Sequence, residues 1–146
     1  MSNKYDYSYE RTANYCYPDS TVLINKLDIH DETELFNAER EYVTVRTLIL
    51  EITPIKGNFA FAHLKEIHKH LFQDIYNWAG QPRTCNIAKQ DLFCLAQYID
   101  GYAEDVFSKF KKENYFLNKT YDEKITALVE LFADINALHP FRERKW

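Results

Sequence analysis

Glycine, proline and cysteine are scarce in this sequence, and it has no long hydrophobic run. Three Gly and four Pro among 146 residues are too few for a turn-rich β-sandwich or barrel. Three Cys is a small, odd number, which argues against a disulfide framework and fits a reducing compartment. No stretch approaches the roughly 18 apolar residues that span a bilayer, and the first residues lack the apolar part of a signal peptide. We therefore expect a cytoplasmic protein without a membrane partner.

Positive charge is also not in excess. Eighteen Lys and Arg stand against 22 Asp and Glu, a net charge of −4, so nothing favours nonspecific nucleic-acid binding. The hydrophobic content of 46% and the aromatic content of 16% are too high for a disordered chain. The length suits one domain. We expect residues 1–20, which are polar and rich in tyrosine, to be irregular, and residues 21–146 to form the domain.

Four segments carry the three- and four-residue apolar spacing of amphipathic helices. They run from Asp31 to the stop at Pro54, and over about 60–78, 91–112 and 122–138. The apolar stripe of the last segment is so broad that we expect neighbours on more than one side. Residues 83–89 alternate β-prone and polar types and predict a small hairpin or an extended loop. The predicted fold class is all-α. The stripe of the first helix is Leu35, Ala38, Tyr42, Val45 and Ile49.

Most familiar catalytic patterns are missing. His63, His68 and His70 share one predicted helix, but their spacing does not bring them together as metal ligands, and we interpret them as ordinary histidines. The cysteines show no C-x-x-C spacing, and the sequence has no glycine-rich phosphate loop and no nucleophile elbow. His139 follows the last apolar helix and precedes Pro140. Taken alone, it is best interpreted as a histidine that ends a helix.

Four motifs change that interpretation. Residues 139–143, His-Pro-Phe-Arg-Glu, resemble the first five positions of the Fic family motif H-P-F-x-[D/E]-G-N-G-R. Residues 17–27 resemble the family's Y-P-G-T-x-V-L-x-N-K-L segment. Residues 61–84 resemble the helix that leads to its flap, and residues 86–89, Asn-Ile-Ala-Lys, stand where its flap has N-I-x-K. Because the four occur in the right order and spacing, the resemblance covers about residues 17–143.

The resemblance implies an all-helical Fic-type domain with a small β-hairpin flap, and a protein adenylyltransferase. Such an enzyme transfers AMP from ATP to a Ser, Thr or Tyr hydroxyl of a target protein. His139 would be the general base, a role that suits histidine because an imidazole can be neutral and accept a proton at physiological pH. Glu143 would hold Mg²⁺, the metal cofactor that accompanies ATP. Phe141 would anchor the loop in the core.

The resemblance also assigns two roles to the flap. Its main chain would pair with the target protein by β-augmentation and present the hydroxyl in line. The flap would also border the nucleotide. The target-binding residues are Thr84, Cys85, Asn86 and Ile87, and the nucleotide-binding residues are Asn86, Ile87, Ala88 and Lys89.

The sequence departs from the motif after Glu143. Arg144, Lys145 and Trp146 stand where the family has Gly-Asn-Gly-Arg. Glycines there would let backbone N–H groups approach phosphate oxygens at a helix N-terminus, and the arginine would clamp the phosphates. We expect impaired or absent catalysis, a domain without its C-terminal helices, and an uncovered apolar face on 122–138 that favours self-association. One inserted nucleotide after the Glu143 codon would explain this ending.

Two alternatives to an adenylyltransferase remain open at this stage. The chain could be a non-catalytic helical remnant or protein-binding module on the Fic scaffold, or it could transfer another phosphate-linked group. The family's inhibitory pattern S/T-x-x-x-E-G/N has only an imperfect match from Thr47 to Glu51, followed by Ile52. An antitoxin-like inhibitor on a separate chain is therefore a further expected partner, by analogy.

Overall fold

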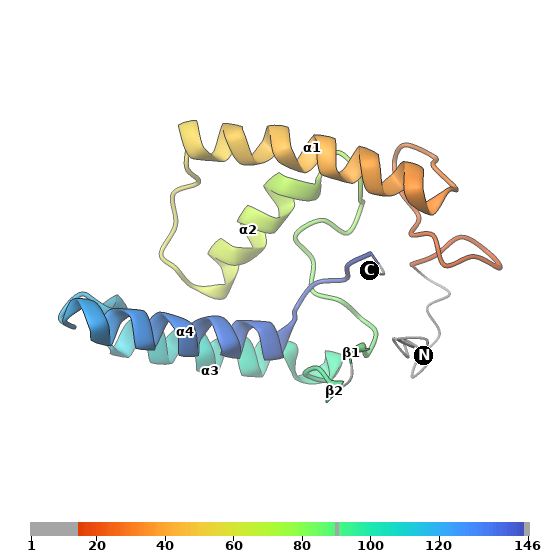
Figure 1. Ribbon diagram of the computed structural model, residues 1–146. Helices are drawn as coiled ribbons and strands as arrows, with labels where there is room; N and C mark the ends of the chain where they lie inside the picture. Colours follow the sequence, from red (N-terminus) through yellow and green to blue (C-terminus); the bar gives the residue numbers. More distant parts are fainter. Residues whose placement is uncertain (1–14, 90, 145–146) are drawn as a thin grey trace.

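The computed structural model describes residues 15–89 and 91–144. Two helical layers make up the molecule: α1 lies on α2, and α3 runs along α4 (Figure 1). Along the chain, a two-stranded antiparallel hairpin lies between the two layers, after α2 and before α3. In it Ala88 is opposite Leu92 and Lys89 is opposite Asp91. The helices and strands are α1 (Glu32–Ile52), α2 (Phe61–Phe72), β1 (Ala88–Lys89), β2 (Asp91–Leu92), η2 (Ala96–Tyr98), α3 (Ile99–Lys112), η3 (Asn114–Phe116) and α4 (Tyr121–Leu138).

The first and last predicted helices are confirmed almost to the residue. Asp31 caps α1, because its Oδ1 accepts a hydrogen bond from the Glu34 amide at 2.8 Å. At α4, Thr120 and Glu123 form a capping box, in which each side chain accepts a hydrogen bond from the other residue's amide. Both helix starts are therefore fixed by local sequence.

The predicted helix over 60–78 ends six residues early, at Phe72. Two carbonyls just beyond this end bind a distant segment: Lys26 donates from its side chain to the Gln73 carbonyl and from its amide to the Ile75 carbonyl, both at 2.7 Å. Ile75 and Tyr76 are thereby buried in the core.

The predicted helix over 91–112 starts late, at Ile99, after the turn η2. Residues 91–92 pair as strand β2, the Phe93 amide binds the Ile87 carbonyl, and the Cys94 amide binds the Ala137 carbonyl. Because these amides are engaged elsewhere, the helix forms only beyond them. The hairpin that residues 83–89 predict is present but displaced, since it spans 88–92.

Most of the buried side chains in the described part of the chain belong to two clusters. The first joins the segment before α1 to the residues that follow α2, and the second lies between α2, α3 and the end of α4. Of the predicted irregular segment 1–20, residues 1–14 lie outside the described part. Tyr15 and Cys16 are buried, and the backbone of Cys16 pairs with that of Leu23 as an isolated antiparallel β-bridge.

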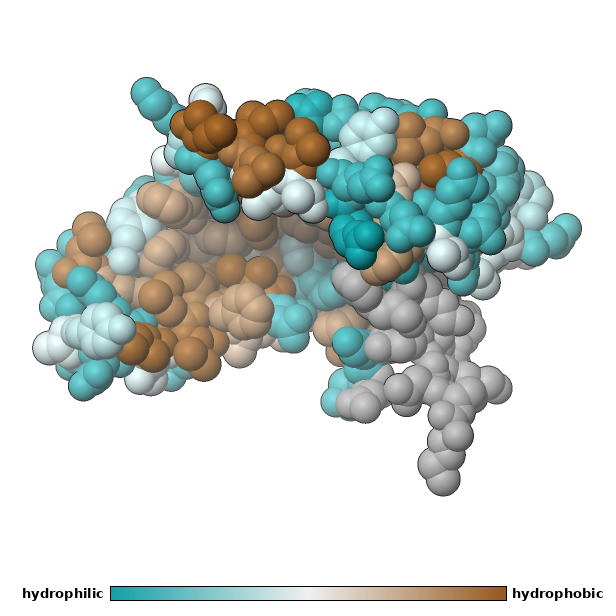
Figure 2. All heavy atoms as spheres, turned by 45° about the horizontal axis from the view of Figure 1, so that its top comes forward, coloured by the Kyte–Doolittle hydropathy of each residue, from teal (hydrophilic) through white to brown (hydrophobic). Residues whose placement is uncertain are grey.

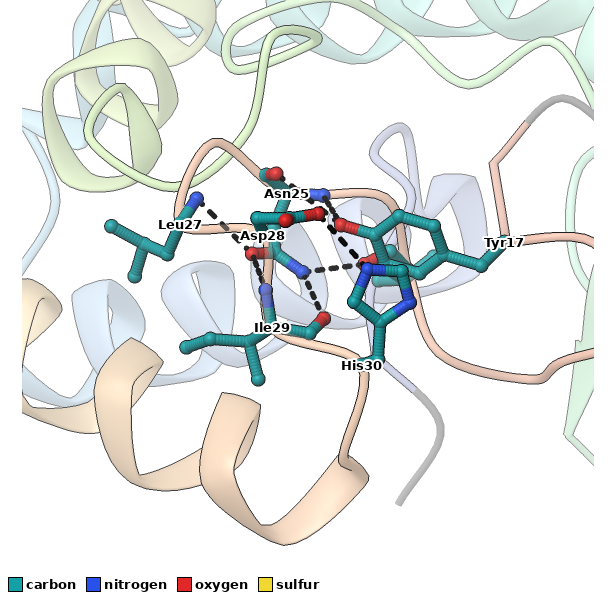
Figure 3. A network of polar contacts seen from close by, with 7 residues as sticks. Tyr17, Asn25, Leu27, Asp28, Ile29 and His30 are labelled. Atoms are coloured by element: carbon teal, nitrogen blue, oxygen red, sulfur yellow. Dashed lines mark hydrogen bonds and ion pairs between the residues drawn. The ribbon is translucent and has the colours of Figure 1, made fainter.

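Asn25 organises the segment that leads into α1 (Figure 3). Its side-chain nitrogen donates to the Leu23 and Ile29 carbonyls at 2.9 and 2.8 Å, and its oxygen accepts from the Leu27 and Ile29 amides. Tyr17 stacks on His30 beside it, with ring centroids 3.8 Å apart. This part of the family resemblance therefore has a structural role.

Two apolar helix faces stay exposed. Of the predicted α1 stripe only Leu35 is buried, and Val45 is 57% exposed. Along α4, Phe132 is 75% exposed, and α3 is the principal partner of this helix within the described residues, so the expected neighbours on several sides are not found. The predicted uncovered face on 122–138 is confirmed. Figure 2 shows hydrophobic surface on both sides of a hollow.

No helix within the described residues combines the length and apolar character needed to cross a membrane.

Candidate active site

The candidate site begins where α4 ends. His139 caps this helix with φ 41° and ψ 66°, in the left-handed region that few residues other than glycine adopt. Proline at position 140 disfavours the right-handed helical conformation for the residue before it, which is one local reason why the helix stops here. Residues 139–143 then form an irregular loop that leads away from the end of α4 toward the C-terminus (Figure 1).

The loop brings the two predicted catalytic residues together. Nε2 of His139 lies 3.1 Å from Oε1 of Glu143. The imidazole is 17% exposed and the carboxylate 35% exposed, so both are reachable from solvent while packed from one side. Within the described residues no cluster of three or more His, Cys, Asp or Glu side chains could hold a metal ion. A cation bound by Glu143 would therefore need further oxygen ligands from a substrate.

Phe141 points inward, as an anchor of this loop should. Its ring packs against the second core cluster and stacks on His68, with centroids 3.8 Å apart and planes 15° apart. Burial lowers the pKa of His68 to about 4. A neutral imidazole is what the contacts require, since Nδ1 of His68 accepts a hydrogen bond from the Gly80 amide at 2.9 Å.

The flap is tied to the same loop. The ring of Phe93, directly after β2, stacks on the His139 imidazole with centroids 4.3 Å apart. Arg83, directly before the flap, is buried and donates from Nε to the His139 carbonyl at 2.8 Å. Its amide donates to the Pro140 carbonyl at 2.8 Å.

The predicted flap residues differ in how far their side chains are buried. Cys85 and Ile87 are buried in the first core cluster, so only their main chain is suited to meet a partner. Asn86 is half-buried, and its Oδ1 accepts from the Ala96 amide at 2.8 Å, which fixes the return of the flap. Ala88 and Lys89 form strand β1. Thr84 is exposed and binds the buried Tyr15 through its amide at 2.9 Å.

A cavity of about 640 Å³ adjoins His139 and Glu143. Its walls come from α1, the end of α2 with the turn after it, α4 and the C-terminal segment, and none of residues 84–89 lines it. Two contacts shape its polar side: Tyr76 donates to Glu39 at 2.5 Å, and Arg144 lies over the Phe36 ring at 4.3 Å. Burial, with the neighbouring Glu39 carboxylate, raises the pKa of Tyr76.

A comparison with the sequence profiles of protein families matches residues 58–143 to the Fic/DOC family. The chain belongs to this family. It is 33% identical to the probable protein adenylyltransferase Fic of Salmonella typhimurium, over 97% of this chain and 69% of that protein. It is 36% identical to the probable protein adenylyltransferase y4lH of Sinorhizobium fredii, over 88% of this chain and 66% of that protein.

Solved Fic domains share the fold. The N-terminal Fic domain of a Bartonella sp. AR 15-3 effector superposes with a TM-score of 0.81 at 25% identity, over 89% of this chain and 65% of that one. BepC of Bartonella tribocorum, solved with bound AMPPNP, gives 0.81 at 23% identity, over 89% and 70%. The chain thus spans about two thirds of the length of these relatives.

Three residues of this candidate site were not identified from the sequence: Arg83, Phe93 and His68. Each acts through a contact with residues 139–141, more than 40 positions away along the chain. Local periodicity carries no signal for such contacts. The only available signal for Arg83 was its place after Gly80 and Pro82, within the segment that resembles the family's flap approach.

Proposed function

We propose that this chain carries the active site of a protein adenylyltransferase, which transfers AMP from ATP to a Ser, Thr or Tyr hydroxyl of a target protein. One observation carries the proposal: His139 and Glu143 meet at 3.1 Å, at the mouth of a cavity and against the base of a hairpin. The Salmonella and Sinorhizobium relatives, both named probable protein adenylyltransferases, support it. So do the Bartonella neighbours solved with ADP and with AMPPNP.

In this mechanism His139 is the general base. Its imidazole accepts the proton of the target hydroxyl while that oxygen forms a bond to the α-phosphorus of ATP and the bond to pyrophosphate breaks. The imidazole must be neutral and correctly turned before this step. The stacked ring of Phe93 and the left-handed cap at position 139 hold it in one orientation.

Glu143 fits a magnesium ion that is shared with a nucleotide. Mg²⁺ in nucleotide enzymes is usually held by one or two carboxylates together with phosphate oxygens and water, and Glu143 supplies one carboxylate. When bound, the ion would neutralise phosphate charge at the reacting end of ATP. Asn86, Ile87, Ala88 and Lys89 would border the nucleotide.

The flap would hold the target protein. Because the side chains of Cys85 and Ile87 are buried, the segment from Thr84 to Ile87 can offer main-chain groups to an extended peptide. Such main-chain pairing recognises an extended backbone more than a particular amino-acid sequence, so the identity of the target stays open.

We further propose that the 146-residue polypeptide transfers AMP poorly. Arg144, in the position of the first motif glycine, carries a side chain that lies over Phe36 of α1 and 3.9 Å from Glu39. It is therefore directed into the cavity and does not form a phosphate cradle. Loss of preorganised phosphate contacts commonly costs about 100-fold to 1,000-fold in rate.

A second candidate function is protein binding. The exposed apolar residues of α1 and α4 offer a surface for self-association or for another protein. Thr47 and Glu51 lie on the exposed side of α1 with Ile52 after them, so the inhibitory pattern is incomplete, and we propose regulation by a separate antitoxin-like inhibitor.

Three free cysteines suit the reducing cytoplasm that we propose as the location.

The test is transfer of label from α-labelled ATP, with Mg²⁺, to proteins of a lysate. His139→Ala is the loss variant, and His30→Ala, on an exposed ring outside the site, is the matched control. Weak labelling that persists in His30→Ala and vanishes in His139→Ala supports the proposed enzyme. Absence of label together with absence of ATP binding by calorimetry supports the binding module.

A further inference from the structure

The most unusual charged group in the described residues is the guanidinium of Arg83. The residue is only 2% exposed, and none of the described acidic side chains forms an ion pair with it. Removing a charge from water is expensive unless hydrogen bonds compensate for it. Burial accordingly lowers the pKa of Arg83. A group held at such a cost needs an explanation in the contacts it makes.

Those contacts are all with backbone carbonyls. At the end of α4, Nε donates to the His139 carbonyl at 2.8 Å and Nη2 to the Leu138 carbonyl at 3.3 Å. At the flap, Nη1 donates to the Cys85 carbonyl at 2.8 Å and Nη2 to the Cys94 carbonyl. The last carbonyls of a helix lack partners within it, and a cation is favoured beside them.

The four carbonyls belong to the two parts of the candidate site. Cys85 lies in the flap segment before β1 and Cys94 follows β2, while Leu138 and His139 end the helix that carries the proposed base. The Cys94 amide also donates to the Ala137 carbonyl at 3.1 Å, and this bond links the same two segments as the arginine contacts. A planar guanidinium with five N–H donors in a fixed fork can bridge these groups at once, and a lysine ammonium cannot reproduce that geometry.

We propose that Arg83 is a positioning residue that holds the proposed base, His139, in register with the flap. This inference rests on the proposed function, in which the flap presents the target hydroxyl to that imidazole. Without the arginine, the His139 carbonyl and both sides of the flap lose a shared donor, and the imidazole moves relative to Phe93.

The test compares Arg83→Met and Arg83→Lys with Arg46→Met in the full chain, without nucleotide. Arg46 is a matched control, because its guanidinium donates two hydrogen bonds to Asp74, at 2.6 and 2.7 Å, whereas the four of Arg83 go to the flap segment and the end of α4. The readouts are the NMR resonances of the His139 imidazole and the hydrogen exchange of the Cys94 amide. Global stability is measured for each variant by urea unfolding.

We expect both Arg83 variants to shift the His139 resonances and to speed Cys94 exchange by about tenfold beyond the change in global stability. Arg46→Met should leave both readouts as in the wild type. Unchanged His139 signals and Cys94 protection in the Arg83 variants overturn the proposal. So does failure of both Arg83 variants to fold while Arg46→Met folds, because the arginine then supports the whole fold. A wild type that does not bind ATP refutes the proposed function and leaves this comparison intact.

Discussion

The imidazole of His139 stacks on the ring of Phe93, with centroids 4.3 Å apart and an angle of 16° between the planes. His139 ends α4, and Phe93 follows the second strand of the flap, so this contact joins the two parts of the site through their side chains. It lies beside the hydrogen bonds of Arg83, which join the same parts through the backbone. The proposed base is therefore oriented by the element that would present its substrate.

Restoring the motif should restore transfer. In a variant that continues with Gly-Asn-Gly-Arg and the relatives' following segment after Glu143, we expect clear labelling of target protein from ATP. In that background His139→Ala should lower kcat by about 100-fold or more, the usual contribution of a general base. His30→Ala, outside the site, serves as its control. Equal activity of the His139→Ala variant would remove the proposed base from the mechanism.

His68 should make stability depend on pH. Burial lowers its pKa from 6.5 to about 4, so the folded protein keeps the ring neutral while the unfolded chain takes up a proton. The neutral, buried ring makes its full contribution to the free energy of unfolding above about pH 6.5. This contribution is lost as the pH falls to about 4, a change of up to about 3 kcal/mol. Urea unfolding across this range measures it.

His68→Gln is the comparison for that titration, because it keeps an acceptor for the Gly80 amide and does not titrate. The difference in unfolding free energy between wild type and variant should therefore move in favour of the wild type as the pH rises from 4 to 6.5. A difference that stays constant over this range would show that the ring is not held neutral in the folded state.

The capping box of α4 should contribute measurably to stability. Thr120→Ala removes the acceptor for the Glu123 amide and should lower the free energy of unfolding by about 1 kcal/mol. Thr126→Ala is the matched control, because its hydroxyl only donates back to the Asp122 carbonyl within the helix, and it should change stability by less than about 0.5 kcal/mol. Equal losses in chemical denaturation would exclude a special role for the cap.

The exposed face of α4 should drive self-association. Replacing Val129 and Phe132 together by lysine should convert a concentration-dependent oligomer into a monomer in sedimentation velocity, because both side chains are largely exposed. Glu130→Lys makes a charge change on the same helix and should leave the association in place. A wild type that sediments as a monomer at high concentration would contradict this prediction.

The sequence predicted what local chemistry determines and missed what distant residues determine. α1 and α4 were predictable because caps, apolar spacing and Pro54 or Pro140 act within a few positions of each boundary. The early end of α2 was not, because Lys26 takes the carbonyls of Gln73 and Ile75. The late start of α3 depends on α4 in the same way, through the Cys94 amide.

The candidate site shows the same division. His139 and Glu143 could be proposed as a pair because they are four positions apart in one motif, and their side chains lie 3.1 Å apart. Arg83 was missed because a buried arginine and a surface arginine look alike in a sequence, and only the fold shows which carbonyls surround it. The apolar stripe of α1 wrongly predicted a buried face for a related reason. Periodicity shows that a face can be buried but not whether a neighbour covers it.

The most direct test of the central claim is an NMR titration of the wild-type chain with Mg²⁺ and ATP, following the imidazole resonances of its histidines. Our account predicts saturable shifts of the His139 signals that are lost in Glu143→Ala, while those of His30 stay in place. His139 signals that do not move while ATP binds, or that move equally in Glu143→Ala, would contradict it.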